Sequence, residues 1–260
     1  MKDLMLTAHQ EQIARGFLAE VSAQRRHLVV ALSGAHAYGF PSPDSDVDLK
    51  AVHIAPARAL LGFGRVGSTN DRLEVRSGVE LDYSSNELRD VLNGVLKGNG
   101  NYIERLLSGY HLQADPVLQE LQPLVSRALS RKVHGHYLGF ASQLARRLDA
   151  PFATVKHVLY VVRCALSGAH MLGTGECETD LSKLATPYGF EEVHELIAAK
   201  RAGERTPLGE DGLEAARRLA TRALSTLNDA LDDAILPVEA DGAELEAWLV
   251  DFRLREIRGP

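Results

Sequence analysis

The chain has 260 residues and a net charge of −6, and 45% of its residues are hydrophobic and 25% charged. This composition is typical of a folded protein, and the length fits one large domain or two ordinary ones. This composition excludes a largely disordered chain and a surface coated in basic residues, and no apolar run approaches the roughly 18 residues of a membrane-spanning helix. Two cysteines are too few for a disulfide framework, and the first residues lack the apolar core of a signal peptide, so we expect a cytoplasmic protein without a membrane partner.

In chain order, strands are predicted before residue 85 and helices after it. Apolar side chains recur at helical spacing over 7–26, and HLVVALSG is typical of a buried strand because it is a short apolar run ending at a glycine. The segments expected next are a turn over 34–45, a strand over 46–54, a loop rich in Gly and Arg up to residue 78, and a strand over 79–83. The expected helices are 86–97, 101–108, 115–148, 152–172, 190–202, 211–235 and 242–256, with exposed loops at 173–180 and 203–210.

This order of elements predicts an α+β fold. A small mixed β-sheet head with flanking helices is followed by an α-helical C-terminal domain. We place the boundary after residue 112, so that 1–112 would form the catalytic domain and 113–260 the helical domain that binds nucleotide or acceptor.

Three carboxylates fall on the predicted strands. Asp46 and Asp48 lie two residues apart, so both side chains leave the same face of a strand, together with Lys50. Asp82, near the end of the third strand, would complete the set from a neighbouring position. Like charges held this close repel each other unless a cation lies between them, and Mg²⁺ prefers such ligands. Three carboxylates can hold two metal ions in the arrangement used for phosphoryl transfer.

Two glycines, Gly34 and Gly39, bracket the turn that precedes these carboxylates. Glycine allows a positive φ and a close approach of backbone amides to an anion, so the turn is a candidate phosphate cradle. Each feature alone has an ordinary structural explanation: an exposed strand edge, or a simple turn. The order strand, glycine turn, strand with D-x-D is more specific than its parts.

The segment GAHAYGFPSPDSDVDLKAVHI resembles the nucleotidyltransferase superfamily typified by DNA polymerase beta, and within it the branch that includes the RNA-ligase-associated RNA-repair polymerases. DYSSNELRDVLNGVLKGNGNYIERLL resembles a second signature of that branch, which places Asp82, Asn101 and Glu104 on its polar positions. The resemblance is specific over about 28–110. It implies metal-binding and catalytic roles for Asp46, Asp48 and Asp82, and nucleotide contacts from Gly34, Ala35 and Gly39.

The resemblance also gives a role to a basic stretch of the chain. From 125 to 163 there are seven basic residues and one acid, whereas 228–251 holds eight acids and no base. Lys156, Tyr160 and Arg163 lie at i, i+4 and i+7 of a predicted helix, so they share one face. A solvated surface face is the ordinary explanation. The family pattern favours an NTP-binding face.

Departures from the family pattern keep a second function open. Ala35 stands where the family usually has a serine whose hydroxyl contacts phosphate, Asp90 replaces a basic residue, and Gly100 replaces a proline. The first hypothesis is an enzyme that uses two Mg²⁺ or Mn²⁺ ions to move an NMP from an NTP, ATP among them, to a hydroxyl acceptor with release of pyrophosphate. The acceptor is open between an RNA end such as that of tRNA, a protein and a small molecule. The alternative is a nucleotide-binding regulatory or antitoxin-like module with little turnover.

Overall fold

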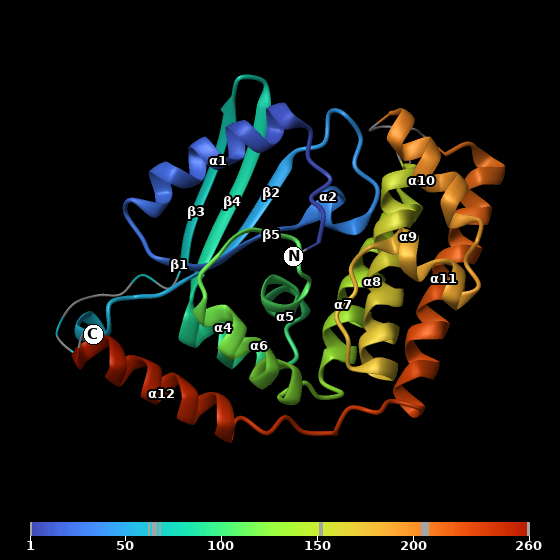
Figure 1. Ribbon diagram of the computed structural model, residues 1–260. Coiled ribbons are helices and arrows are strands. Elements are labelled where there is room, and N and C mark those ends of the chain that lie inside the picture. The colour runs from blue at the N-terminus through green and yellow to red at the C-terminus, as the bar shows by residue number, and fades with distance from the viewer. Residues whose placement is uncertain are drawn as a thin grey trace. The chain divides into compact units, whose positions relative to one another are not determined.

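The computed structural model describes residues 2–61, 63, 67, 69–150, 153–203 and 208–258. The chain folds into two compact units (Figure 1). The first, here called the sheet unit, consists of Met1–Gly34, Asp46–Ala128 and Ala240–Pro260. The second, the helical unit, consists of Ala35–Ser45 and Leu129–Glu239. The compact units divide the chain at other places, and the functional boundary expected after residue 112 stays a prediction.

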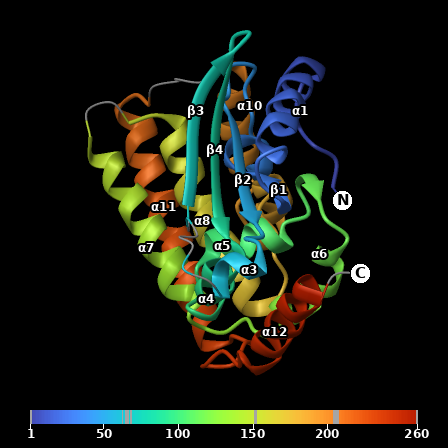
Figure 2. The ribbon, with the colours of Figure 1, turned by 90° about the vertical axis from the view of Figure 1, so that its left-hand side faces the viewer.

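A five-stranded mixed sheet forms the centre of the sheet unit, with the order β3-β4-β2-β1-β5. β2 and β4 are parallel, and the other neighbours are antiparallel. All six residues of β1 are buried, because the strand lies inside the sheet between β2 and β5. Figure 2 shows β3 and β4 as one long hairpin. The bounds are β1 His27–Leu32, β2 Val47–His53, β3 Thr69–Arg76, β4 Val79–Glu87 and β5 His111–Ala114.

The helices of the sheet unit are held by caps and by packing on the sheet. A capping box between Thr7 and Gln10 begins α1, and the Phe17 ring of this helix packs edge-on against Tyr83 of β4, with ring centroids 5.4 Å apart. The side chain of Glu87, the last residue of β4, caps α4 by accepting from the backbone N–H of Arg89 at 2.7 Å. The helices are α1 Ala8–Ser22, α3 Ala57–Leu61, α4 Leu88–Leu96, α5 Gly100–Leu107, α6 Val117–Arg127 and α12 Ala243–Arg258.

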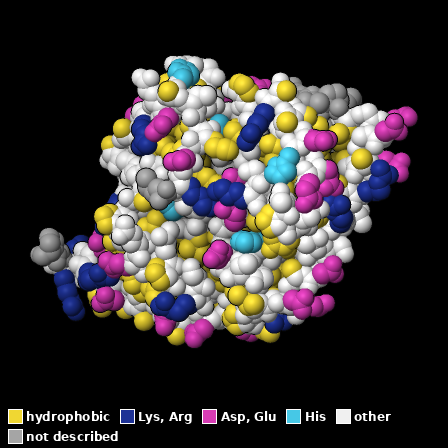
Figure 3. Space-filling view, turned by 45° about the vertical axis from the view of Figure 1, so that its right-hand side comes forward, with side chains coloured by type: hydrophobic (Ala, Val, Ile, Leu, Met, Phe, Trp, Pro, Cys, Tyr) yellow, Lys and Arg dark blue, Asp and Glu magenta, His cyan; other side chains and the backbone are white. Residues whose placement is uncertain are grey.

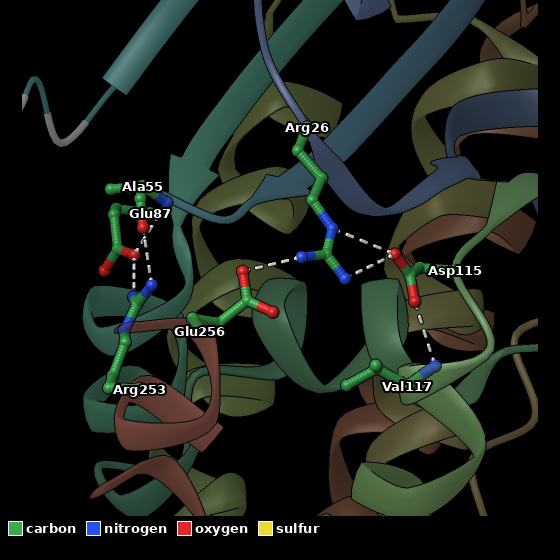
Figure 4. A network of polar contacts seen from close by, with 7 residues as sticks. All are labelled: Arg26, Ala55, Glu87, Asp115, Val117, Arg253 and Glu256. Atoms are coloured by element: carbon green, nitrogen blue, oxygen red, sulfur yellow. Dashed lines mark hydrogen bonds and ion pairs between the residues drawn. The ribbon is translucent and has the colours of Figure 1, made fainter. Parts of the chain in front are cut away.

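The last helix, α12, is joined to the rest of the sheet unit by polar contacts, some of which Figure 4 shows. Arg253 forms a buried ion pair with Glu87 and donates to the backbone carbonyl of Ala55 at 2.6 Å. Glu256 accepts from Arg26 at 2.8 Å, and Arg26 also binds Asp115. The chain therefore completes the sheet unit with residues that follow the whole helical unit in sequence.

The core of the helical unit consists of three packed helices, α7, α8 and α11, which run side by side in Figures 1 and 2. Gly168 of α8 makes this packing possible, because a Cβ there would lie 2.7 Å from the Cβ of Tyr137 and 2.8 Å from a methyl carbon of Leu227. The helices are α2 Gly34–Tyr38, which begins at the last residue of the sheet unit, α7 Val133–Ala145, α8 Val155–Thr174, α9 Leu181–Leu184, α10 Val193–Ala202 and α11 Glu210–Asp232, with 3₁₀ turns at Arg146–Asp149 and Thr186–Tyr188.

The α+β fold class is confirmed, with corrections to single elements. The loop expected before residue 78 contains β3, and β4 continues to Glu87, so the helix expected from residue 86 begins at Leu88. The strand β5 and the short helices α2, α3 and α9 were not predicted. The helix expected over 115–148 is two helices separated at 128–132, and the first residue of the helix expected over 152–172 lies outside the described residues.

The opposite charges of the two biased segments meet in each unit. In the sheet unit Arg127 pairs with Glu244 at 2.7 Å, and in the helical unit Lys132 pairs with Glu239 at 2.5 Å. Figure 3 shows acidic side chains interspersed among the basic ones on the face that it draws. Part of the basic field expected over 125–163 is thus neutralised. Within the described residues, no helix combines the length and the apolar character needed to span a membrane.

Candidate active site

A pair of carboxylates lies on one face of the sheet, where β2 and β4 run parallel. Asp48 is directly opposite Asp82 in the register of the two strands. The side chains of Val47, Leu49 and Leu81 are buried on the other face, so the alternation of the strands sends both aspartates to the same side. The Asp82 carboxyl is close enough to Asp48 to raise the pKa of Asp48. The fold thus brings together two of the three predicted carboxylates.

Lys50 is the cation of this pair. Its Nζ lies 2.9 Å from Oδ2 of Asp82 and 3.7 Å from Oδ1 of Asp48. The Lys50 side chain is 20% exposed and that of Asp48 19%, so solvent screens these charges only in part. The ammonium of Lys50 therefore offsets carboxylate repulsion in the metal-free chain.

Burial raises the pKa of Asp48 from its ordinary value near 3.8 to about 7. Lys50 lowers this pKa, and the charges of Asp46 and Asp82 raise it. Because burial makes the charged form of Asp48 unfavourable, a bound cation would stabilise that charged form. The pair therefore fits a divalent metal ion chemically.

This pKa predicts how the stability of the metal-free protein depends on pH. In the unfolded chain Asp48 ionises near pH 4, whereas in the folded chain it keeps its proton up to about pH 7. The folded state therefore binds more protons between these values, and stability falls as pH rises from about 4 to 7, by up to about 4 kcal/mol, then levels off. Urea unfolding of the parent and of Asp48→Asn in EDTA measures this, since other carboxylates cancel in the difference. A difference that stays constant between pH 4 and 8 would exclude the raised pKa.

Asp46 lies just before β2 and is half-buried, and its charge is close enough to raise the pKa of Asp48. Among the described residues, no group of three or more His, Cys, Asp and Glu side chains is arranged to hold a metal ion. The cluster of Asp46, Asp48 and Asp82 around two ions therefore stays a prediction.

Gly34 lets the backbone approach the carboxylate of Asp48. Its φ is +60°, a left-handed conformation that favours glycine, and a Cβ at this position would lie 1.9 Å from Oδ2 of Asp48. The neighbouring Ser33 N–H donates to the backbone carbonyl of Asp48 at 3.0 Å. The turn and the carboxylate thus form one structure, and a side chain at residue 34 would displace Asp48.

The other residues of the predicted phosphate turn belong to the helical unit. Ala35 is 5% exposed at the start of α2. Gly39 has a φ of +87°, and a Cβ there would lie 2.0 Å from Oδ1 of Asp180, the N-cap of α9. Close packing against Asp180 is thus one reason for glycine at residue 39. The nucleotide contacts predicted for Ala35 and Gly39 stay predictions.

Lys156, Tyr160 and Arg163 all lie on α8, but their surroundings differ. Arg163 is 4% exposed, and its guanidinium lies 3.5 Å from the centre of the Tyr38 ring. Tyr160 packs edge-on against Tyr38 and Phe40, with ring centroids 5.7 and 5.4 Å away. Lys156 is half-buried, with its Nζ 6.0 Å from the Tyr160 ring. Arg163 and Tyr160 therefore support the turn between β1 and β2, and their predicted nucleotide contacts stay predictions.

The two further candidates lie on α5. Asn101 is exposed in the first turn, which the side chain of Asn99 caps by accepting from the backbone N–H of Asn101 at 3.1 Å. Glu104 is 7% exposed on the same helix. Their roles also stay predictions.

Lys50 is the residue that the predicted site leaves out. The alternation of the strand already places it on the face of Asp48, and its position two residues after D-x-D carried the signal. A lysine in a strand is commonly a solvated residue, so only its contacts with Asp48 and Asp82 show that it belongs to the group.

Comparison with known proteins finds two similar relatives and a similar structure. The chain is 28% identical over 156 residues to the uncharacterized protein MJ0002 of Methanocaldococcus jannaschii. The match covers 60% of this chain and 64% of MJ0002, so it spans less than two thirds of the length of MJ0002. It is 27% identical over 185 residues to the uncharacterized protein YcgL of Bacillus subtilis, across 68% of this chain and 70% of that protein. A nucleotidyltransferase-like protein from Exiguobacterium sibiricum matches 85% of this chain and 74% of its own, with a TM-score of 0.35 and 14% identity.

A family model settles the classification. The model of RlaP, described as the RNA repair pathway DNA polymerase beta family, matches residues 10–251. This range includes both signatures that the sequence suggested, and every residue of the carboxylate group. The chain belongs to the RNA repair pathway DNA polymerase beta family, which is of the DNA polymerase beta nucleotidyltransferase type.

Proposed function

We propose that the chain is a metal-dependent nucleotidyltransferase that moves a nucleoside monophosphate from an NTP to a hydroxyl acceptor and releases pyrophosphate. The observation that carries this proposal is the pairing of Asp48 with Asp82 in one register position of β2 and β4, with Lys50 as its counter-ion. A face kept only for stability gains nothing from a buried carboxylate, Asp48, whose pKa is raised further by the charge of Asp82. Family membership supports the same reaction class.

Asp48 and Asp82 would hold the metal, with Asp46 beside them. A bound Mg²⁺ or Mn²⁺ neutralises the triphosphate and stabilises charge on the attacking and leaving oxygens. The carboxylate of Asp82, the more exposed of the pair at 45%, would orient the acceptor hydroxyl. Gly34 keeps the turn against Asp48 without a side chain in the way. Catalysis of this kind depends on positioning and charge, more than on covalent chemistry.

The acceptor that the family description favours is RNA, and we propose a hydroxyl at an RNA end. Pyrophosphate release tests this directly. Each of the four NTPs is supplied with Mg²⁺ and an RNA that ends in a free 3′-hydroxyl, and a matched RNA with a blocked 3′ end serves as the control. We expect release with the free end only. Release that needs a protein or a small hydroxyl compound instead would replace RNA as the acceptor, and no release with any of them would contradict the reaction.

Lys156 is the residue that tests whether α8 serves the nucleotide. We expect Lys156→Ala to weaken NTP binding by about 1.5–3 kcal/mol and to reduce its dependence on salt, because a charge-assisted contact to phosphate is lost. Calorimetric titration at two salt concentrations measures both effects. Arg163→Ala is less informative, since it also removes the cation from the Tyr38 ring and is expected to destabilise the helical unit. Parent-like binding by Lys156→Ala would show that this face has another purpose.

A further inference from the structure

A tight turn at Ser42–Ser45 lies directly before the first carboxylate of the site. Pro43 occupies the second position of this turn, where its fixed φ is favourable. The Ser45 N–H donates to the Ser42 carbonyl at 3.0 Å, and the Ser42 N–H donates to Oγ of Ser45 at 3.0 Å. Both serines are buried, and Ser45 is joined by its peptide bond to Asp46. The turn is therefore joined to the first predicted carboxylate by a single peptide bond.

Lys200 of α10 holds the turn from 155 residues or more away in sequence. Its side chain is 0% exposed, and Nζ donates to Oγ of Ser42 at 2.7 Å and lies 3.5 Å from Oγ of Ser45. The two serine hydroxyls are themselves 3.0 Å apart. One ammonium thus ties together both ends of the turn.

Burial of an ammonium is expensive. Taking a charged group out of water costs several kcal/mol, and an apolar side chain of similar size commonly serves stability as well or better. A lysine kept at full burial is therefore poorly explained by stability alone. Its contacts point to the specific placing of one turn.

The same helical unit holds the segment at two further points. Arg201, next to Lys200 on α10, donates to the Gly39 carbonyl at 2.9 Å. Thr179, before α9, donates its hydroxyl to the Ala37 carbonyl at 2.9 Å. The two residues joined by each of these bonds are 142 and 162 positions apart in sequence. The chain between β1 and β2 is therefore held by residues that come much later in the chain.

We propose that Lys200 is a positioning residue for nucleotidyl transfer, which fixes the Ser42–Ser45 turn and through it the place of Asp46. This inference rests on the proposed function. Lys200 does not contact the reacting groups in this role, but acts through the two serine hydroxyls and the peptide bond that follows Ser45. Removing the ammonium frees the turn, and a displaced ligand carboxylate slows transfer far more than it weakens binding of the NTP.

The test compares Lys200→Met, Ser42→Ala, the double variant and, as a control, Lys97→Met at an exposed lysine of the sheet unit. Hydrogen exchange of the 42–48 backbone is measured together with kcat, KM for the NTP and thermal unfolding. In Lys200→Met we expect exchange of the Ser42 and Ser45 amides to be at least tenfold faster and kcat to fall at least tenfold. KM is expected to change less than threefold, and the unfolding temperature to stay the same or rise. Because both residues act on the same turn, Lys200→Met is expected to cost little more in the Ser42→Ala background.

The outcomes separate the two proposals. A parent that transfers nothing overturns the proposed function, and this role with it. An active parent with a Lys200→Met variant of unchanged kcat and unchanged exchange overturns the role of Lys200 only. An equal, additive loss in the Ser42→Ala background also overturns it, because Lys200 would then act by another route. If Lys200→Met does not fold, Ser42→Ala and Ser45→Ala decide, since each removes one hydroxyl, and parent-like exchange and kcat in both would overturn the proposal.

Discussion

Asp48→Asn is expected to abolish nucleotidyl transfer, with a loss of at least about a thousandfold in kcat, and to leave the protein folded. The amide keeps the shape of the side chain but removes the charge that would bind the metal. It also removes a carboxylate whose pKa burial raises to about 7, so the metal-free variant is expected to unfold at a higher temperature than the parent at pH 8. Pyrophosphate release and calorimetric unfolding in EDTA measure the two effects.

The control for this variant is Asp251→Asn, at a carboxylate of the same unit that is 68% exposed on α12. An exposed ion pair contributes little to stability, so this control is expected to match the parent in both measurements. Full activity in Asp48→Asn would end the metal-site interpretation. A variant that unfolds would instead assign Asp48 a structural role.

Gly34→Ala is expected to lower transfer at least about a hundredfold, because the new Cβ would lie 1.9 Å from Oδ2 of Asp48 and must displace it. The left-handed φ of +60° adds backbone strain of about 1–2 kcal/mol. Gly78→Ala separates these two causes. Gly78 has a φ of +81°, but its Cβ would meet no atom within 4 Å.

Both variants are expected to lose the stability that the backbone strain costs, Gly34→Ala is expected to lose more because it also displaces Asp48, and only Gly34→Ala is expected to lose transfer. Kinetic assays and urea unfolding of the two purified variants provide the comparison. Equal activity in Gly34→Ala and Gly78→Ala would show that the close approach of the turn to Asp48 has no part in the reaction.

The elements that the sequence predicted well are those whose patterns were complete within a few residues. After His27 the run LVVAL is apolar, which fits a strand that is covered on both faces, and the alternation after Asp46 follows from one buried face of β2. The edge strand β3 was missed because its first residues are polar. Its two apolar residues, Leu73 and Val75, lie on the exposed face and are 70% and 71% exposed. The amphipathic signal of a strand needs one buried face, and here the apolar face is the exposed one.

The features that the sequence did not predict depend on contacts between residues that are distant in sequence. The helix expected over 115–148 breaks near residue 130 although no Gly or Pro marks the place. Arg131 there donates its backbone N–H to the Pro237 carbonyl at 2.8 Å and its side chain to the Ala234 carbonyl at 2.8 Å, which a local pattern cannot reveal. The same holds for Lys200, which in the helical sequence IAAKRA looks like a surface lysine.

For the candidate site, strand alternation was sufficient to place Asp48 and Lys50 on one face, and a third acidic strand suggested Asp82. The register that sets Asp48 opposite Asp82 comes from the parallel pairing of β2 with β4. The sequence could not show this, because the chain between them includes β3 and an expected loop. The boundary between the two units divides the phosphate turn after Gly34. The sequence could not show this either, because α2 contacts residues more than 100 positions away, such as Thr179.

The most direct test of nucleotidyl transfer follows the α-phosphate itself. Purified protein is incubated with each α-³²P-labelled NTP, Mg²⁺ and total cellular RNA, protein and small molecules as separate fractions, beside an Asp46→Ala/Asp48→Ala double variant. The prediction is that the parent transfers label to one fraction, the RNA, and releases unlabelled pyrophosphate, and that the double variant transfers none. Equal labelling by the double variant, or binding of NTP by the parent without transfer to any fraction, would contradict a nucleotidyltransferase that uses these carboxylates.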